Sequence, residues 1–154
     1  MTREALSPAR RAEIERIFHT APFIRMLGIA LVSAADGACE TELVLREAHL
    51  QQDGFVHAGV QATMADHTAG TAAATLAPEG HIVLTADFGI SLMRAARGRR
   101  LRCRARVLKA GRRLSFVESE IFCDDSDRIV PGVPGILVSK ARVSIAMAPV
   151  PADR

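Results

Sequence analysis

Gly54-Phe-Val-His-Ala-Gly-Val-Gln-Ala-Thr-Met-Ala-Asp-His-Thr-Ala-Gly-Thr-Ala-Ala-Ala-Thr-Leu76 is the segment around which the rest of this chain can be arranged. From Val60 onward it contains mostly Ala, Thr, Met and Leu, and no proline interrupts it before Pro78. Ala, Met and Leu are good helix formers. Small and apolar residues recur at three- and four-residue steps, so almost every face of such a helix is apolar or small. The pattern predicts a tight turn followed by a long helix that is buried nearly all round.

One residue breaks this apolar pattern. Asp66 places a carboxylate in the middle of the helix, where a charge is costly unless it is paired, solvated or used. The small residues around it, Ala62, Ala69 and Gly70, indicate close packing on its side. We therefore favour a catalytic role for Asp66 over that of an ordinary surface charge. His67 is adjacent to it, and adjacent helix residues do not share a face, so we expect His67 to point elsewhere.

The start of the helix offers backbone donors. Ala58 and Gly59 leave the backbone nearly bare beside His57, and the first N–H groups of a helix have no partner inside the helix. Together with the helix dipole they favour negative charge, and a substrate oxygen can approach them closely. The Ala58–Gly59 amides are thus a candidate oxyanion site. The His57 ring can hold the turn through a backbone bond or transfer a proton; we favour the first, because helix-start geometry alone explains a polar residue there.

These two features cannot act on one atom within a single chain. Gly59 and Asp66 are seven residues apart, about 10 Å along a helix axis. A reacting carbonyl has to lie about 3 Å from each group. If both groups act on it, one of them comes from an antiparallel copy of the helix. The spacing therefore predicts a two-fold homodimer with a shared site.

The motif Gly54-Phe-Val-His57-Ala-Gly59, followed by Asp66, resembles the hotdog-fold acyl-CoA thioesterases of the phenylacetic-acid-degradation (PaaI-like) branch. The usual pattern there is Gly-x-x-His-Gly-Gly and then a helix with an Asp seven residues on. The later strand that begins Thr85-Ala-Asp-Phe-Gly also fits the branch, and the resemblance covers roughly residues 22–140. The chain departs from the pattern at Ala58, which replaces the first Gly of the pair.

The resemblance implies an acyl-CoA thioesterase that hydrolyses a thioester to a carboxylate and free coenzyme A. It implies that Asp66 of the partner subunit is the general base or, through an anhydride, the nucleophile. The amides of Ala58 and Gly59 then polarise the carbonyl. Gln51, which replaces the family's Asn, and Thr85 then position the water. No metal or redox cofactor is needed, since coenzyme A is part of the substrate, and the branch is often tetrameric, which implies a homotetramer of two dimers.

The order of the expected elements is a short helix, two strands, the long helix and about four strands. This order predicts an α+β fold in which one antiparallel sheet of about six strands wraps around one central helix, the hotdog fold, in a single domain over residues 1–154 with its core at about 22–148. The short helix starts at Ser7-Pro8, with Phe23 and Met26 after it as candidate pocket lining. The strands are expected at 28–32, 39–45, 82–93, 101–108, 114–123 and 136–147.

Arginines gather between residues 94 and 113, within a net charge of +3. In the strand at 101–108 they alternate with apolar residues, which favours a solvated outer sheet face. The other interpretation is recognition of the coenzyme A phosphates, for which Arg is well suited. The candidates near turns are Arg97, Arg99, Arg112 and Arg113, which with His57 form the expected substrate-binding set. Nucleic-acid binding is disfavoured, because no aromatic stacking platform accompanies the charge.

Composition excludes several other classes. Three widely spaced cysteines indicate reduced core thiols rather than a disulfide framework or a metal site. The first residues lack the apolar region of a signal peptide, and no apolar run approaches the roughly 20 residues of a membrane span, so we expect a cytoplasmic protein that binds no membrane. No Ser or Cys has the spacing of a catalytic triad with His and Asp.

A non-catalytic acyl-CoA-binding hotdog module remains the alternative function. A hydratase or dehydratase would need a different set of catalytic residues. The Pro-rich loop at 124–135 is longer than the family's usual turn, and we expect the tail from Pro149 to be frayed.

Overall fold

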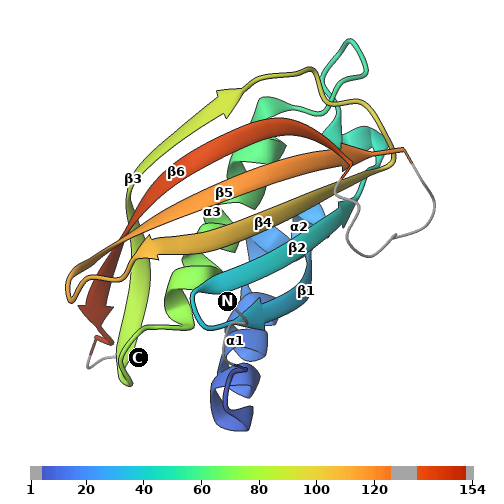
Figure 1. The fold of residues 1–154 in the computed structure, drawn as a ribbon. Helices are drawn as coiled ribbons and strands as arrows, with labels where there is room; N and C mark the ends of the chain where they lie inside the picture. Colours follow the sequence, from blue (N-terminus) through green and yellow to red (C-terminus); the bar gives the residue numbers. More distant parts are fainter. Residues whose placement is uncertain (1–4, 126–134, 152–154) are drawn as a thin grey trace.

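The computed structural model describes residues 5–125 and 135–151, and in it a six-stranded antiparallel sheet curves across one long helix (Figure 1). This confirms the predicted α+β hotdog architecture. The elements in chain order are α1 (Pro8–Thr20), α2 (Pro22–Leu27), β1 (Ala30–Ala35), β2 (Ala38–Val44), a 3-10 turn (Glu47–His49), α3 (Ala58–Ala74), β3 (His81–Leu92), β4 (Arg100–Lys109), β5 (Leu114–Asp124) and β6 (Ile136–Pro149).

The strand order in the sheet is β1-β2-β4-β5-β6-β3. All pairs are antiparallel, and β3, which follows the central helix in the chain, crosses to the far edge and pairs with β6. At 12 residues β3 is a long strand, and within the described part of the chain its other side has no partner. An edge of this kind presents a row of backbone donors and acceptors to a second chain.

Three expectations about local structure need correction. The first strand begins at Ala30 rather than at Gly28, because Gly28 has a φ of +83° and ends α2 in the left-handed conformation. The six-residue helix α2 was not expected. It leaves Phe23 and Met26 55% and 64% exposed, away from the cavities described below, so they do not line the pocket. Strand β6 continues to Pro149, into the segment expected to fray; most of the loop at 124–135 lies outside the described residues.

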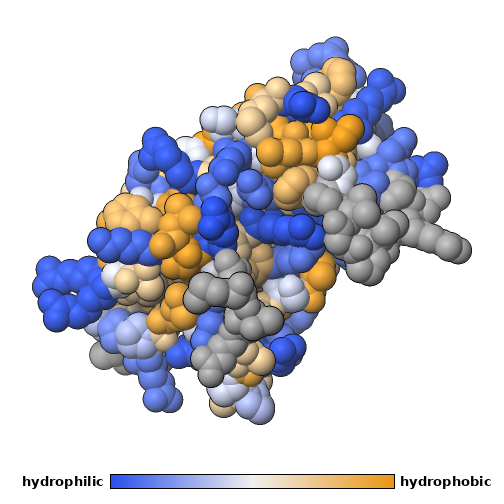
Figure 2. Space-filling model, viewed as in Figure 1, coloured by the Kyte–Doolittle hydropathy of each residue, from blue (hydrophilic) through white to orange (hydrophobic). Residues whose placement is uncertain are grey.

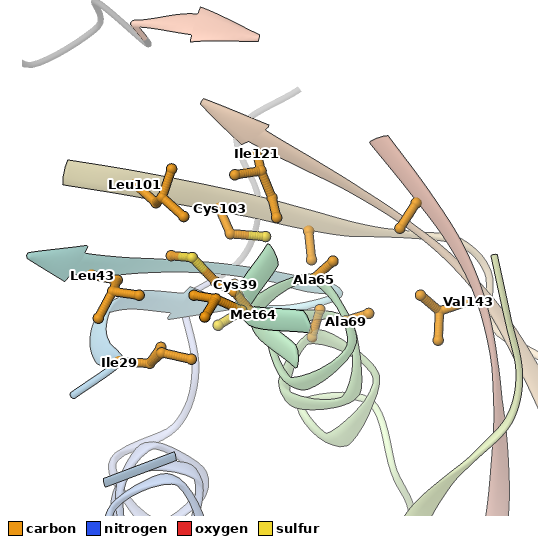
Figure 3. Close-up of a cluster of buried hydrophobic side chains, with 14 of the residues drawn as sticks. Ile29, Cys39, Leu43, Met64, Ala65, Ala69, Leu101, Cys103, Ile121 and Val143 are labelled. Atoms are coloured by element: carbon orange, nitrogen blue, oxygen red, sulfur yellow. The ribbon is translucent and has the colours of Figure 1, made fainter. Parts of the chain in front are cut away.

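The core lies between α3 and the concave face of the sheet (Figure 3). Met64 and Ala69 of α3 are fully buried, as are Leu101 and Cys103 of β4 and Ile121 of β5. Small residues on α3 let the helix approach the sheet closely, so the packing relies on alanines where larger side chains would not fit. Burial raises the pKa of the Cys103 thiol to about 12, which leaves it unreactive, as expected of a core thiol.

Two buried hydroxyl contacts fix the position of α3 on the sheet. The hydroxyls of Thr68 and Thr41 lie 2.7 Å apart, joining α3 to β2. The Ser119 hydroxyl of β5 donates to the Ala65 carbonyl at 2.9 Å. Because buried polar groups are costly when unpaired, these contacts disfavour rotation of the helix about its axis. They therefore hold the opposite face of α3, which carries Asp66, in one orientation.

Adding bulk at a sheet-facing alanine of α3 tests this packing. We expect Ala69→Leu to lower the free energy of unfolding by about 1–3 kcal/mol or more, because its side chain has no room against the sheet. Urea unfolding followed by circular dichroism measures the change. Ala12→Leu, at an exposed position of α1, is the matched control and is expected to change it by less than about 0.5 kcal/mol. Equal effects of the two substitutions would contradict close packing at Ala69.

Candidate active site

Asp66 and Thr85 come together between α3 and β3. The Thr85 hydroxyl donates a hydrogen bond of 2.7 Å to Oδ1 of Asp66. The pairing of β3 with β6 shifts register between Thr85 and Asp87, where one residue of β3 is unpaired. A bulge of this kind re-aims side chains and is common beside active sites. The bulge thus marks the point at which β3 presents a hydroxyl to the helical carboxylate.

A cavity of about 270 Å³ opens beside this pair. Asp66 and Thr85 lie in its wall, and α1 contributes Ile14 and Ile17 from the other side. Most of the remaining wall is apolar or small, from α3, β3 and β6. The arrangement offers one carboxylate with a hydroxyl partner at the edge of a largely apolar space, which is the usual composition of a small-molecule site.

His67 lies in the wall of the same cavity, contrary to the expectation that it points elsewhere. Its ring packs on Phe18 of α1, with 4.8 Å between ring centroids, and its Nε2 is buried without a partner among the described residues. Burial lowers the pKa of His67 below its ordinary value of 6.5, against the opposing effect of the Asp66 charge. The sequence argument failed because α1 crosses α3 here and so widens the site beyond one helix face.

The start of α3 is organised by His57. His57 is the N-cap residue, and its Nδ1 accepts a 2.9 Å hydrogen bond from the Gly59 amide. This is the backbone bond that the structural interpretation of His57 requires. It also engages the Gly59 amide, which the sequence offered as an oxyanion donor. Among the described residues no group accepts a hydrogen bond from the Ala58 amide, so that amide is the open donor of the pair.

Gln51 belongs to the turn that leads into α3. Its side-chain oxygen accepts a hydrogen bond from the Asp53 amide, and the Gly54 amide donates to the Gln51 carbonyl at 3.0 Å. Gln51 therefore lies with the helix start, whereas Thr85 lies with Asp66 two turns further on. Within one protomer the structure divides the expected catalytic residues into these two groups.

The four candidate phosphate-binding arginines are also divided. Arg97 and Arg99 precede β4, and Arg112 and Arg113 follow it, so the ten-residue strand separates the two pairs by roughly 30 Å. They cannot hold one phosphate group together within a protomer. The first pair lies at the end of the sheet where α3 begins, since the backbone of Ala96, next to Arg97, accepts the Val56 amide at 2.9 Å.

The outer face of the sheet carries rows of opposite charge rather than a basic surface. Arg104 lies 3.4 Å from Glu40, and Lys140 lies 2.8 Å from Glu118, whose pKa is lowered by the hydrogen bond from Lys140. Figure 2 accordingly shows hydrophilic and hydrophobic residues interspersed on this side of the molecule. Arg102 is an exception to the solvated face expected from the alternation, because only 4% of it is exposed.

Two further expectations concern metals and membranes. Over residues 5–125 and 135–151, no three His, Cys, Asp or Glu side chains are grouped closely enough to hold a metal ion. None of the helices in those ranges is long and apolar enough to cross a bilayer.

Comparison with known proteins shows the family of this chain. Residues 53–130 match the family model described as the thioesterase superfamily. The chain belongs to the thioesterase superfamily. It is 31% identical over 119 residues to acyl-coenzyme A thioesterase 13 of Homo sapiens, an alignment that covers 76% of this chain and 84% of the relative. This thioesterase is therefore a thioester hydrolase, and the match spans both the helix start and Asp66.

Solved structures agree on the fold. A thioesterase family protein from Silicibacter pomeroyi superposes with a TM-score of 0.81 at 26% identity, covering 92% of this thioesterase and 99% of that chain. The PaaI protein from the phenylacetic acid degradation operon of E. coli superposes with a TM-score of 0.77 at 16% identity, covering 94% and 96% of the two chains. The predicted hotdog thioesterase is thus confirmed, and its fold is also that of the PaaI protein.

The buried His67 makes the stability of this thioesterase depend on pH. Its folded-state pKa lies below 6.5, so the unfolded chain binds a proton more readily, and stability is lost as pH falls below about 6.5. We expect His67→Phe to reduce this loss, by up to about 1.4 kcal/mol per pH unit. Urea unfolding of both proteins between pH 8 and pH 5 measures it. A pH dependence identical in the two proteins would contradict the burial of a neutral imidazole.

Proposed function

We propose that this protein is an acyl-CoA thioesterase whose active site combines Asp66 and Thr85 of one protomer with the Ala58 amide of its partner. The observation that carries the proposal is the separation of these groups. Ala58, with its open amide, and Asp66 are eight residues apart in α3, about 12 Å along the helix axis. A thioester carbonyl cannot contact both in one chain, whereas an antiparallel second copy of α3 can supply the missing group.

The exposed edge of β3 supports the dimer. Two β3 strands paired edge to edge around a two-fold axis would extend the sheet across both protomers, and would remove an edge that is otherwise open to aggregation. Such pairing would place the α3 helices near each other in opposite directions. We propose a homodimer as the unit that forms the site, with a homotetramer as a dimer of such dimers.

Two observations support coenzyme A as part of the substrate: the name of a similar protein and the position of two arginines. Acyl-coenzyme A thioesterase 13, at 31% identity, acts on acyl-coenzyme A by its name. Arg97 and Arg99 lie at the end of the sheet where α3 starts, and Arg97 is exposed. Arginine binds phosphate well, so this pair is the better candidate for the coenzyme A phosphates. Arg112 and Arg113, at the opposite end of β4, can serve only a site formed with another protomer.

The chemistry is a hydrolysis in which Asp66 removes a proton from water. The water oxygen bonds to the thioester carbon, negative charge develops on the carbonyl oxygen, and the Ala58 amide stabilises it. The C–S bond then breaks, and the thiolate takes up the proton held by Asp66 to give free coenzyme A. The carboxylic acid releases its remaining proton to solvent and leaves as a carboxylate. Thr85 holds the carboxylate by its 2.7 Å hydrogen bond. By the resemblance to the family, Gln51 at the partner's helix start takes part in orienting the water. Direct attack by Asp66 through an anhydride uses the same groups.

Removing the carboxylate tests the base. We expect Asp66→Asn to lower kcat by about 10²–10⁴-fold while coenzyme A binding is retained, because the amide cannot accept the proton. Free-thiol release from a panel of acyl-CoA esters measures turnover. Thr85→Val should lower kcat by roughly ten- to hundredfold. Thr85→Ser should lower kcat much less, since serine keeps the hydroxyl. An active Asp66→Asn protein would remove Asp66 from the mechanism, and binding without turnover in the wild type would favour a non-catalytic module.

Removing one backbone N–H tests the donor. Ala58 is the first residue of α3, where proline fits, and His57 already has φ −59° and ψ 137°, as a residue before proline requires. We expect Ala58→Pro to fold normally and to lower kcat by about 10²–10³-fold, because its nitrogen carries no hydrogen. Free-thiol release again measures turnover, with circular dichroism to confirm folding.

Mixing the two inactive proteins tests sharing between protomers. A heterodimer of Asp66→Asn and Ala58→Pro chains has one site with both groups intact, so random exchange of subunits should restore about a quarter of the wild-type sites. If each site instead lies within one chain, every site in the mixture lacks one group and no activity returns. Exchange is followed by free-thiol release after mild denaturation and joint refolding, with each variant refolded alone as the control.

A further inference from the structure

Gly70 lies in the interior of α3, at a position where the packing of the described residues would allow a side chain. Its backbone is helical and not in the left-handed region, and beyond the adjoining residues and backbone of its own helix a Cβ added to it would have no described atom within 4 Å. Glycine in a helix interior is less favourable than alanine. The neighbouring Ala69, by contrast, is fully buried against the sheet. The absence of a side chain at position 70 therefore leaves open space that the described part of this chain does not fill.

That space is the cavity beside the catalytic carboxylate. Gly70 lies in its wall, one turn beyond Asp66 and about 6 Å from it along the helix. Ala74, the last residue of α3, is also in the wall, about 12 Å from Asp66. The cavity therefore runs along α3 from Asp66 toward its C-terminal end.

The cavity continues into a larger groove of about 780 Å³ between α1 and β3. The two spaces share the wall residues Ile14, Ile17, Ala74, Val83 and Leu84. Helix α1 is held above the groove by Arg10, whose guanidinium donates to the Ala77 carbonyl at 2.7 Å, and by the buried Ile14. Ile17 and Leu84 nevertheless remain 41% and 55% exposed, so the groove presents apolar surface that a ligand could cover.

The cavity beside Asp66 and the groove that continues it form one channel. We propose that this channel binds the acyl chain of the substrate and that the small size of Gly70 determines which acyl groups enter it. The inference rests on the proposed thioesterase function, since it places the thioester at Asp66. A straight chain advances about 1.25 Å per carbon, so a channel of about 12 Å holds a linear acyl group of roughly ten carbons. An acetyl group ends before Gly70, whereas a decanoyl group passes it. The favoured substrates are therefore linear acyl-CoA esters long enough to pass Gly70.

The test compares Gly70→Leu with the wild type on acetyl-CoA and decanoyl-CoA. In the wild type, kcat/KM for decanoyl-CoA should exceed that for acetyl-CoA by at least about a hundredfold, because burial of each methylene is favourable. Gly70→Leu should lower kcat/KM for decanoyl-CoA by at least about tenfold and change that for acetyl-CoA by less than about twofold. Ala12→Leu, which adds one carbon less on the exposed side of α1, should change neither. Equal losses on both substrates would overturn the proposal.

Binding of thioethers separates this inference from the proposed function. S-methyl-CoA and S-decyl-CoA cannot be hydrolysed, and calorimetry should show tighter binding of the decyl compound to the wild type, with most of the difference lost in Gly70→Leu. If the wild type hydrolyses no ester but binds S-decyl-CoA more tightly than S-methyl-CoA, the proposed function fails and the acyl channel stands. If both thioethers bind the wild type equally, the channel is wrong even where hydrolysis is found.

A second variant and a sedimentation measurement complete the design. Gly70→Ala should raise Tm by about 2–4 °C, because alanine favours the helix and meets no obstacle, and should reduce decanoyl-CoA turnover less than leucine does. Both variants should sediment like the wild type. If they change the oligomeric state, the open side of Gly70 is an interface with a second copy of the chain, and the proposal is overturned.

Discussion

A carboxylate on a largely buried helix is the constraint on which the rest of the structure depends. The sheet-facing side of α3 carries no charge, and Asp66 can carry its charge only on the side that the sheet leaves uncovered. Hydroxyl contacts from β2 and β5 fix the rotation of the helix, so the carboxylate faces β3 and α1. The bulge in β3 supplies a hydroxyl partner there, and α1 leaves a cavity rather than closing over it. The buried contacts and the carboxylate thus lie on opposite faces of one helix.

Much of the fold could be predicted from the sequence, because its signals are periodic. The small-residue helix and the alternation in β4 each indicate one local structure, and both are found. Helix α2 gave no such signal, since six residues are too few to display a helical period. The burial of Arg102 was also missed, because alternation in one strand predicts which face a residue occupies and not what covers that face.

The catalytic roles assigned from the sequence stay predictions, whereas the positions of those residues can be compared with the structure. The resemblance of the motif pointed to Asp66 and Thr85, which the structure joins by a hydrogen bond. His67 was excluded by reasoning from a single helix, and only the crossing of α1 brings it into the same cavity. The separation of the four arginines, by contrast, could have been found from the length of β4 alone. Local spacing predicts chemistry along one element, whereas a cavity belongs to several elements at once.

The ring of His57 has a consequence for how relatives of this chain can be recognised. A Cβ at position 59 would lie 3.0 Å from the ring nitrogen that accepts the Gly59 amide, so the helix cap favours glycine there. At position 58 a methyl group is accommodated, and Ala58 still keeps its amide. The contacts of the cap therefore favour glycine only at the second position of the usual His-Gly-Gly pair, and the first position can vary. Chains with other residues at that middle position can carry the same cap and the same open amide.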